Sequence, residues 1–150
     1  MKKTIFYTLF AVLLSGTVFA ADEETVVSNV VKNSFQKEFV GAQSVSWEAL
    51  GSKNIYHAAF IYNNERLNAY YNGEGTLLAT GRFIKQESLP MLVAKGIAEQ
   101  YSKFNVDEVI ELVSGSETSY ILKINNDKQK LYVQAFHDGS TSVLKKEKKK

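Results

Sequence analysis

The sequence has no cysteine, one proline, one tryptophan and two histidines in 150 residues. The missing cysteine excludes disulfides, a thiol nucleophile and cysteine–zinc sites. His57 and His137 lie far apart in the sequence and neither has a neighbouring set of ligands, so no metal site is predicted. A glycine-rich phosphate loop and a Gly-x-Ser-x-Gly elbow are also missing. We therefore expect no metal, no cofactor and no enzymatic activity.

Two sets of side chains keep a catalytic alternative open. His57 lies in an otherwise apolar stretch, where a histidine is more often structural than a general base or a ligand. Asp107, Glu108 and Glu111 could supply the carboxylate pair of a hydrolase, but they begin a predicted strand and more readily face solvent. A hydrolase therefore ranks third among the functions considered.

The N-terminus carries the features of a cleaved export signal. Lys2 and Lys3 precede an apolar run over residues 5–14, and small residues then lead to Ala20 and Ala21. This order predicts a signal peptide over residues 1–20, cleaved between Ala20 and Ala21. No later run approaches the roughly 20 apolar residues of a membrane span. We expect a periplasmic or secreted protein with no membrane span.

The charge distribution argues against nucleic acid as a partner. Removing residues 1–20 takes two of the 18 basic residues, which leaves 16 basic and 16 acidic. Residues 145–150 hold five lysines and one glutamate, so residues 21–144 hold 11 basic and 15 acidic residues, a net charge of −4. An acidic body binds phosphate backbones poorly. The lysine-rich tail, 145–150, is predicted to be a solvated end, with contact to an anionic envelope surface as the alternative.

Two amphipathic helices are predicted from apolar residues spaced three and four apart. The first follows residue 25 and ends near Gly41. The second has Ser88 as its N-cap and Pro90 near its first turn. The stripe of the first helix consists of Val26, Val27, Val30, Val31, Phe35 and Phe39.

Alternating apolar residues predict strands in the rest of the chain. Residues 55–62 are apolar on both faces, which fits a central strand or a strand whose outer face meets a partner. Asn63-Asn64 predicts a two-residue hairpin, because asparagine tolerates the left-handed backbone that such turns need. The strands are expected at residues 44–49, 55–62, 65–71, 76–84, 106–113, 119–124, 130–136 and 141–144.

A helix followed by four strands is predicted twice, over residues 25–84 and 88–144. Each half has a core too small to make it stable on its own. We expect the halves to join edge to edge, or to pack as one α+β unit, in a single domain over residues 21–144. Three pairs of identical residues offset by 64 positions support the duplication: Val45 and Val109, Tyr56 and Tyr120, Gly75 and Gly139.

A set of motifs follows in order along the chain: Phe35-x-x-x-Phe39, Gly41-Ala42, Val45-x-Trp47, Tyr56-x-Ala58-x-Phe60, Tyr70-Tyr71 before Gly75, Leu89-Pro90, and Tyr120. Together they resemble the exported beta-lactamase-inhibitor-like, PepSY-like domain family of Bacteroidetes. One departure is Val40, because the family usually has a proline there. The resemblance implies an α+β fold: a tandem repeat of helix plus four-stranded antiparallel sheet, forming one curved sheet of about eight strands with helices on one face. The family is similar in fold to an inhibitor that binds an enzyme with the open face of its sheet. A shared fold alone does not imply the same role for this chain.

The first half offers a candidate protein-binding face. Alternation along residues 55–62 places His57 and Ile61 on the side away from the helix, and Arg66 and Tyr70 share that side on the next strand. Tyrosine and arginine dominate the residues that carry binding energy at interfaces. We therefore expect a binding face centred on His57, Ile61, Arg66 and Tyr70.

The sequence favours a non-enzymatic exported binding module, such as an inhibitor or regulator of an envelope or secreted protein. The alternative is a carrier or sensor of a small apolar or peptide ligand held between sheet and helices. A stoichiometric protein partner captured from an envelope extract would favour the first function. A small molecule seen in native mass spectrometry would favour the second.

Overall fold

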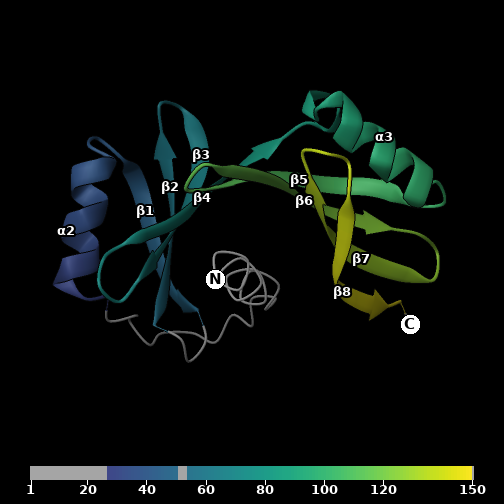
Figure 1. Cartoon of the computed structure of the whole chain (residues 1–150). Coiled ribbons are helices and arrows are strands. Elements are labelled where there is room, and N and C mark those ends of the chain that lie inside the picture. Colours follow the sequence, from purple (N-terminus) through teal and green to yellow (C-terminus); the bar gives the residue numbers. More distant parts are fainter. Residues whose placement is uncertain (1–26, 51–53, 150) are drawn as a thin grey trace. The chain divides into compact units, whose positions relative to one another are not determined.

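A computed structural model describes residues 27–50 and 54–149 (Figure 1). The predicted signal peptide, with its cleavage at Ala20 and Ala21, lies outside these residues. The described residues form two α-helices, one short 3-10 turn and eight strands. In chain order these are α2 (Asn29–Glu38), β1 (Gln43–Leu50), β2 (Ile55–Tyr62), β3 (Glu65–Asn72), β4 (Leu77–Ile84), η1 (Gln86–Ser88), α3 (Met91–Gln100), β5 (Asn105–Ser114), β6 (Glu117–Asn125), β7 (Gln129–Phe136) and β8 (Thr141–Lys148).

The eight strands form an open antiparallel sheet in the order of the chain, β1 to β8. One antiparallel sheet with separate helices confirms the predicted α+β class. The chain divides into two compact units, Met1–Thr80 and Gly81–Lys150. Each unit has a helix and a hydrophobic core of its own. The internal duplication and the curvature of the sheet stay predictions.

Helix α2 covers one face of the strands in the first unit (Figure 1). Ser28 caps its first turn, because the Ser28 Oγ accepts a hydrogen bond from the Val31 N–H at 3.4 Å. The Phe39 N–H closes the last turn on the Phe35 carbonyl oxygen at 2.9 Å. The rings of Phe35 and Phe60 meet edge to face, with centroids 4.8 Å apart. The core of this unit consists of Val27, Val31, Phe35, Ala58, Phe60, Ala69 and Tyr71.

Strand β2 has the two faces that its sequence predicts. Phe60 packs in the core under α2, and alternation places His57 and Ile61 on the opposite face. The hairpin that follows is also confirmed, because Asn63 and Asn64 have φ angles of 51° and 64°. Two left-handed residues define the hairpin turn whose twist suits the flanking strands.

Strand β1 forms one edge of the sheet and carries a bulge. Its register against β2 shifts between Gln43 and Ser46, and Ser44 has a φ angle of 52°. A bulge re-aims the residues around it and discourages another chain from pairing with an exposed edge. Beyond the bulge, Trp47 is half-buried, and its ring centroid lies 5.2 Å from that of Phe35.

Helix α3 begins later than the sequence predicts. Ser88 lies in the short turn η1, and Pro90 occupies the N-cap position without a side-chain hydrogen bond. The prediction of Ser88 as the N-cap is therefore wrong. The physical reason is the proline, because a residue that precedes proline is held in extended backbone. Leu89 has φ −65° and ψ 141°, which breaks the helix before Met91.

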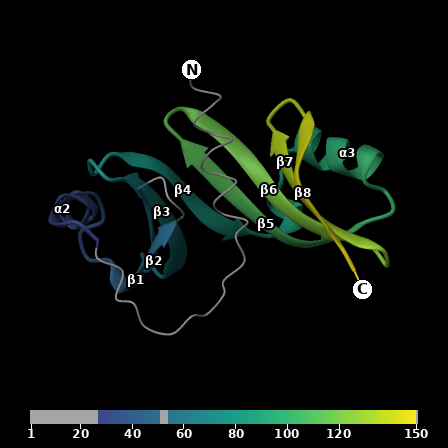
Figure 2. The same ribbon diagram turned by 90° about the horizontal axis from the view of Figure 1, so that it is seen from below.

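A close approach between α3 and the turn joining β7 to β8 explains two glycines. A Cβ built on Gly96 would lie 2.2 Å from the Gly139 carbonyl oxygen. A Cβ on Gly139 would lie 2.6 Å from the Leu92 carbonyl oxygen, and Gly139 also has a φ angle of 83°. Figure 2 shows α3 beside the strands of this unit. The core of the second unit consists of Leu89, Val93, Ile97, Val109, Tyr120, Leu122, Ile124, Leu131, Val133 and Ala135.

Strand β8, the other edge of the sheet, runs to Lys148 and so extends past its predicted end at residue 144. Residues 145–148 are paired with β7, for example Lys146 with Leu131 and Lys148 with Gln129. The prediction of a solvated tail from residue 145 is therefore wrong for these four residues. Lysines are compatible with an edge strand because part of such a strand faces water, and they protect it from pairing with other chains.

Candidate functional site

The register of β2 against β3 brings the four predicted face residues together. His57 lies opposite Tyr70, and Ile61 lies opposite Arg66. Directly opposed residues in an antiparallel pair have their Cβ atoms about 5 Å apart on the same face. The four side chains therefore form two cross-strand pairs on the face of the first unit that lies opposite α2, with the Ala59–Asn68 pair between them. We call this set the outer patch: His57, Ile61, Arg66 and Tyr70.

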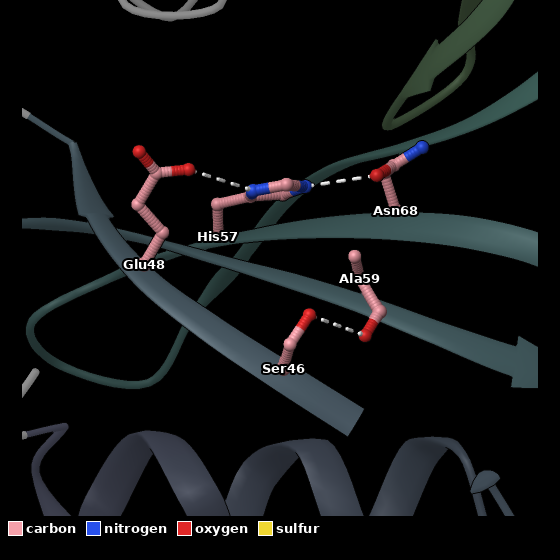
Figure 3. Close-up of polar contacts among 5 residues, drawn as sticks. All are labelled: Ser46, Glu48, His57, Ala59 and Asn68. Carbon is pink, nitrogen blue, oxygen red and sulfur yellow. Dashed lines mark hydrogen bonds and ion pairs between the residues drawn. The ribbon is translucent and has the colours of Figure 1, made fainter. Parts of the chain in front are cut away.

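His57 is held between two polar side chains from the strands on either side (Figure 3). Its Nε2 lies 2.9 Å from the Asn68 Oδ1 on β3, which accepts a hydrogen bond from the ring. Its Nδ1 lies 3.6 Å from the Glu48 Oε2 on β1, a contact that is ionic when the ring is protonated. Figure 3 shows these side chains on the side of the strands away from the helix. Polar contacts on both sides fix the plane of the imidazole.

Tyr70 completes the ordered half of the outer patch. Its ring stacks on the His57 ring, with centroids 4.9 Å apart and planes inclined by 13°. Only 5% of Tyr70 is exposed. Burial raises the pKa of the Tyr70 hydroxyl well above its usual range, and the negative charge of Glu48 raises it further. Tyr70 is therefore a neutral, rigid support for His57.

Ile61 and Arg66 form the accessible half of the outer patch. Ile61 is 39% exposed. Arg66, opposite it, is also exposed. An apolar side chain next to a guanidinium is a combination that is common at protein interfaces.

The described contacts around His57 include no nucleophile–base pair. Ser46 is the hydroxyl on β1 nearest in sequence to Glu48, and its Oγ donates a hydrogen bond to the Ala59 carbonyl oxygen at 3.4 Å (Figure 3). Both nitrogens of the His57 ring face other side chains. A nucleophile–base pair needs a hydrogen bond between the two groups. No such bond joins Ser46 and His57 among the contacts that the structure describes.

The acidic residues of β5 also have other partners. The Asn125 Nδ2 donates a hydrogen bond to the Asp107 Oδ1. The Arg82 Nε donates to the Glu111 Oε2 at 2.6 Å. These carboxylates are engaged separately, so the paired-carboxylate interpretation gains no support. Within residues 27–50 and 54–149, no group of three or more His, Cys, Asp or Glu side chains could hold a metal ion.

Two residues of the site were not among the predicted ones. Asn68 falls on the predicted face by alternation alone, but its contact with His57 runs diagonally across the β2–β3 pair. Glu48 lies opposite His57 in the β1–β2 register. Sequence alternation placed Glu48 on the polar side of its strand, and only the register shows that this side carries His57.

A cavity of about 280 Å³ lies at the other side of the first unit, between the end of α2 and the start of β1. The chain leaves α2 through Gly41, whose φ angle is 86°, and the bulge of β1 follows immediately. Two exposed apolar residues border it, Val40 at 74% and Val45 at 37%. The residues that line the cavity are Lys32, Phe35, Gln36, Phe39, Val40, Gly41, Ala42, Val45 and Trp47.

Comparison with known proteins identifies the fold through solved structures and not through sequence. No protein-family model matches the chain, and no curated protein sequence matches it. Solved structures do match. A protein of Bacteroides eggerthii assigned to the periplasm has a TM-score of 0.69 at 15% identity, with 81% of this chain and 88% of that chain covered. A DUF2874 family protein of Bacteroides ovatus has a TM-score of 0.68 at 20% identity, covering 85% and 89%.

A BLIP-like protein of Bacteroides fragilis is a third match. Its TM-score is 0.63 at 20% identity, with 81% of this chain and 85% of that chain covered. The chain thus has the fold of the BLIP-like proteins of Bacteroides, which confirms the sequence resemblance at the level of the fold. The predicted periplasmic or secreted location agrees with the location assigned to the B. eggerthii protein. None of the described helices has the length and apolar content needed to cross a membrane.

Proposed function

We propose that the protein is an exported, non-enzymatic binding module that docks a protein partner on the outer patch. The observation that carries the proposal is the pairing of an ordered ring stack, His57 on Tyr70, with the accessible pair Ile61 and Arg66. A rigid surface loses little conformational freedom when a partner binds. An apolar residue beside an arginine supplies both desolvation energy and a directional charge.

The wider organisation is part of the same proposal. A signal peptide over residues 1–20 directs the chain to the periplasm or the outside of the cell. One PepSY-like domain begins at residue 21 and, because β8 ends at Lys148, extends past the predicted boundary at residue 144. Its halves, 25–84 and 88–148, arose by duplication. In support, a helix followed by four strands occurs twice in the described chain. The partner is an envelope or secreted protein, and the fold shared with a BLIP-like protein favours an inhibitory or regulatory role.

Photo-crosslinking at the outer patch tests the proposal. A crosslinking residue at Ile61 is compared with one at Val143, an equally apolar strand residue that is 50% exposed. We expect a discrete protein adduct from the envelope extract at position 61, competed away by unlabelled wild type. The double variant Ile61→Asp with Arg66→Glu should not compete. Equal adducts at both positions, or equal competition by the double variant, would remove the outer patch as the docking site.

The choice of variants follows from burial. Tyr70 is almost fully buried, so its replacement by alanine would report on folding as much as on binding. Ile61 and Arg66 are accessible, and exposed substitutions usually change stability by no more than about 0.5 kcal/mol. A melting temperature close to that of the wild type therefore separates a loss of binding from a loss of structure.

A second candidate function is a carrier or sensor of a small apolar or peptide ligand. The cavity between α2 and β1 favours it, because three aromatic side chains line a space near the lower end of the volumes typical of small-molecule sites. A small molecule that co-purifies with the full chain in native mass spectrometry, and is lost when Ala42 is changed to leucine, would support carriage. Binding unaffected by Ala42→Leu would place the ligand elsewhere.

A further inference from the structure

The cavity between α2 and β1 combines aromatic side chains with a single charged residue. Phe35, Phe39 and Trp47 contribute their rings. Phe35 contacts both of the others: its ring centroid lies 5.3 Å from that of Phe39 and 5.2 Å from that of Trp47. Three rings packed in this way form a preorganised wall for an apolar chain or a flat ring.

Polar groups in the cavity come from the exposed face of α2. Lys32 and Gln36 are one helical turn apart, and both are exposed. Lys32 is the one ionisable side chain among the nine residues that line the cavity. The acidic residue nearest to it in the helix, Glu38, is occupied elsewhere: its Oε2 accepts a hydrogen bond from the Tyr71 hydroxyl at 2.9 Å. The charge at the cavity is therefore positive and is not neutralised by a carboxylate within it.

We propose that this cavity binds an amphipathic carboxylate, with the apolar part against Phe35, Phe39 and Trp47 and the carboxylate at the Lys32 ammonium. The aromatic rings favour an apolar chain or ring, and the lysine favours an anion over a cation or a neutral alcohol. The volume of about 280 Å³ suits a ligand of roughly ten non-hydrogen atoms. This inference rests on the second candidate function, ligand carriage, and is independent of docking on the outer patch.

Trp47 makes the test direct, because it is the only tryptophan of the chain and lines the cavity. Its fluorescence is recorded while the full chain is titrated with octanoate, octan-1-ol or octylammonium, three probes with one apolar chain and different head groups. We expect a saturable change in Trp47 emission with octanoate, a clearly weaker one with octan-1-ol and none with octylammonium.

Two lysines on α2 provide a matched pair of variants. Lys32 lines the cavity, whereas Lys37 is exposed on the same helix and does not. An exposed ion pair is worth up to about a fivefold change in affinity. Lys32→Gln should therefore weaken octanoate binding about fivefold, and Lys32→Glu should weaken it about tenfold. Lys37→Glu should change it less than twofold. Ala42→Leu, which fills the cavity, should abolish the response to all probes.

The outcomes separate this inference from the function on which it rests. Equal binding of octanoate and octan-1-ol, unaffected by Lys32→Glu, would overturn the carboxylate assignment and leave ligand carriage standing. An equal effect of Lys32→Glu and Lys37→Glu would also overturn it, because the change in affinity would then come from the net charge of the helix and not from a contact within the cavity. No response to any probe would overturn both the assignment and the carriage function.

Discussion

The close approach of α3 to the β7–β8 turn gives a quantitative prediction for Gly139. An alanine there meets two obstacles: a left-handed backbone, which costs a non-glycine residue about 1–2 kcal/mol, and a Cβ only 2.6 Å from the Leu92 carbonyl oxygen. Relief of such overpacking costs typically about 1–3 kcal/mol. Gly139→Ala should therefore lower the free energy of unfolding by about 2–5 kcal/mol.

Gly115 supplies the matched control. It also lies in a hairpin turn of the second unit with a positive φ angle, 59°, but a Cβ built on it meets nothing within 4 Å. Gly115→Ala should therefore lose only the backbone contribution, about 1–2 kcal/mol. Urea unfolding followed by circular dichroism gives both free energies. Equal losses for the two variants would show that the contact of α3 with the turn is not tight, and would refute the packing account.

Three further predictions concern the buried tyrosines and the sheet edge. Tyr71→Phe removes a hydrogen bond to α2 and should lower the free energy of unfolding by about 0.5–1.5 kcal/mol in urea titrations. Burial raises the pKa of both Tyr70 and Tyr71. The unfolded chain therefore loses these protons first as the pH rises above about 10, so the stability from the two tyrosines is complete below pH 10 and falls above it. Ultraviolet titration of the folded protein should show Tyr70 and Tyr71 among the late-ionising tyrosines, with Tyr70 ionising earlier in Glu48→Gln; ionisation of every tyrosine near pH 10 would contradict the burial. Lys146→Val with Lys148→Val should give species of larger mass than the wild type in light scattering, because it removes edge-strand charges; a mass equal to that of the wild type would show that they do not protect the edge.

Much of the fold could be predicted from local signals. Helix α2, the two-sided strand β2 and the Asn63-Asn64 hairpin each follow from a period or a turn residue that acts over a few positions. The errors occurred where two signals compete. Ser88 is a good N-cap by type, but Pro90 holds the residue before it in extended backbone. The lysines after residue 144 indicate solvent, but an edge strand tolerates them.

The candidate site could be predicted only in part. Alternation was sufficient to place His57 and Ile61 on one face. It does not define the register between strands, and the register is what brings Glu48 to His57. The burial of Tyr70 was not predicted, because alternation shows which face a side chain occupies but not what surrounds it. The cavity depends on how the chain leaves α2 through Gly41, a geometry that no sequence period describes.

The affinity of the captured partner for three forms of the protein tests the central claim most directly. Isothermal titration would compare the wild type, the double variant Ile61→Asp with Arg66→Glu, and the cavity variant Ala42→Leu. Loss of two interface residues that carry binding energy should weaken the affinity at least 100-fold, and filling the cavity should leave it unchanged. A partner that binds the double variant as tightly as the wild type would contradict docking on the outer patch.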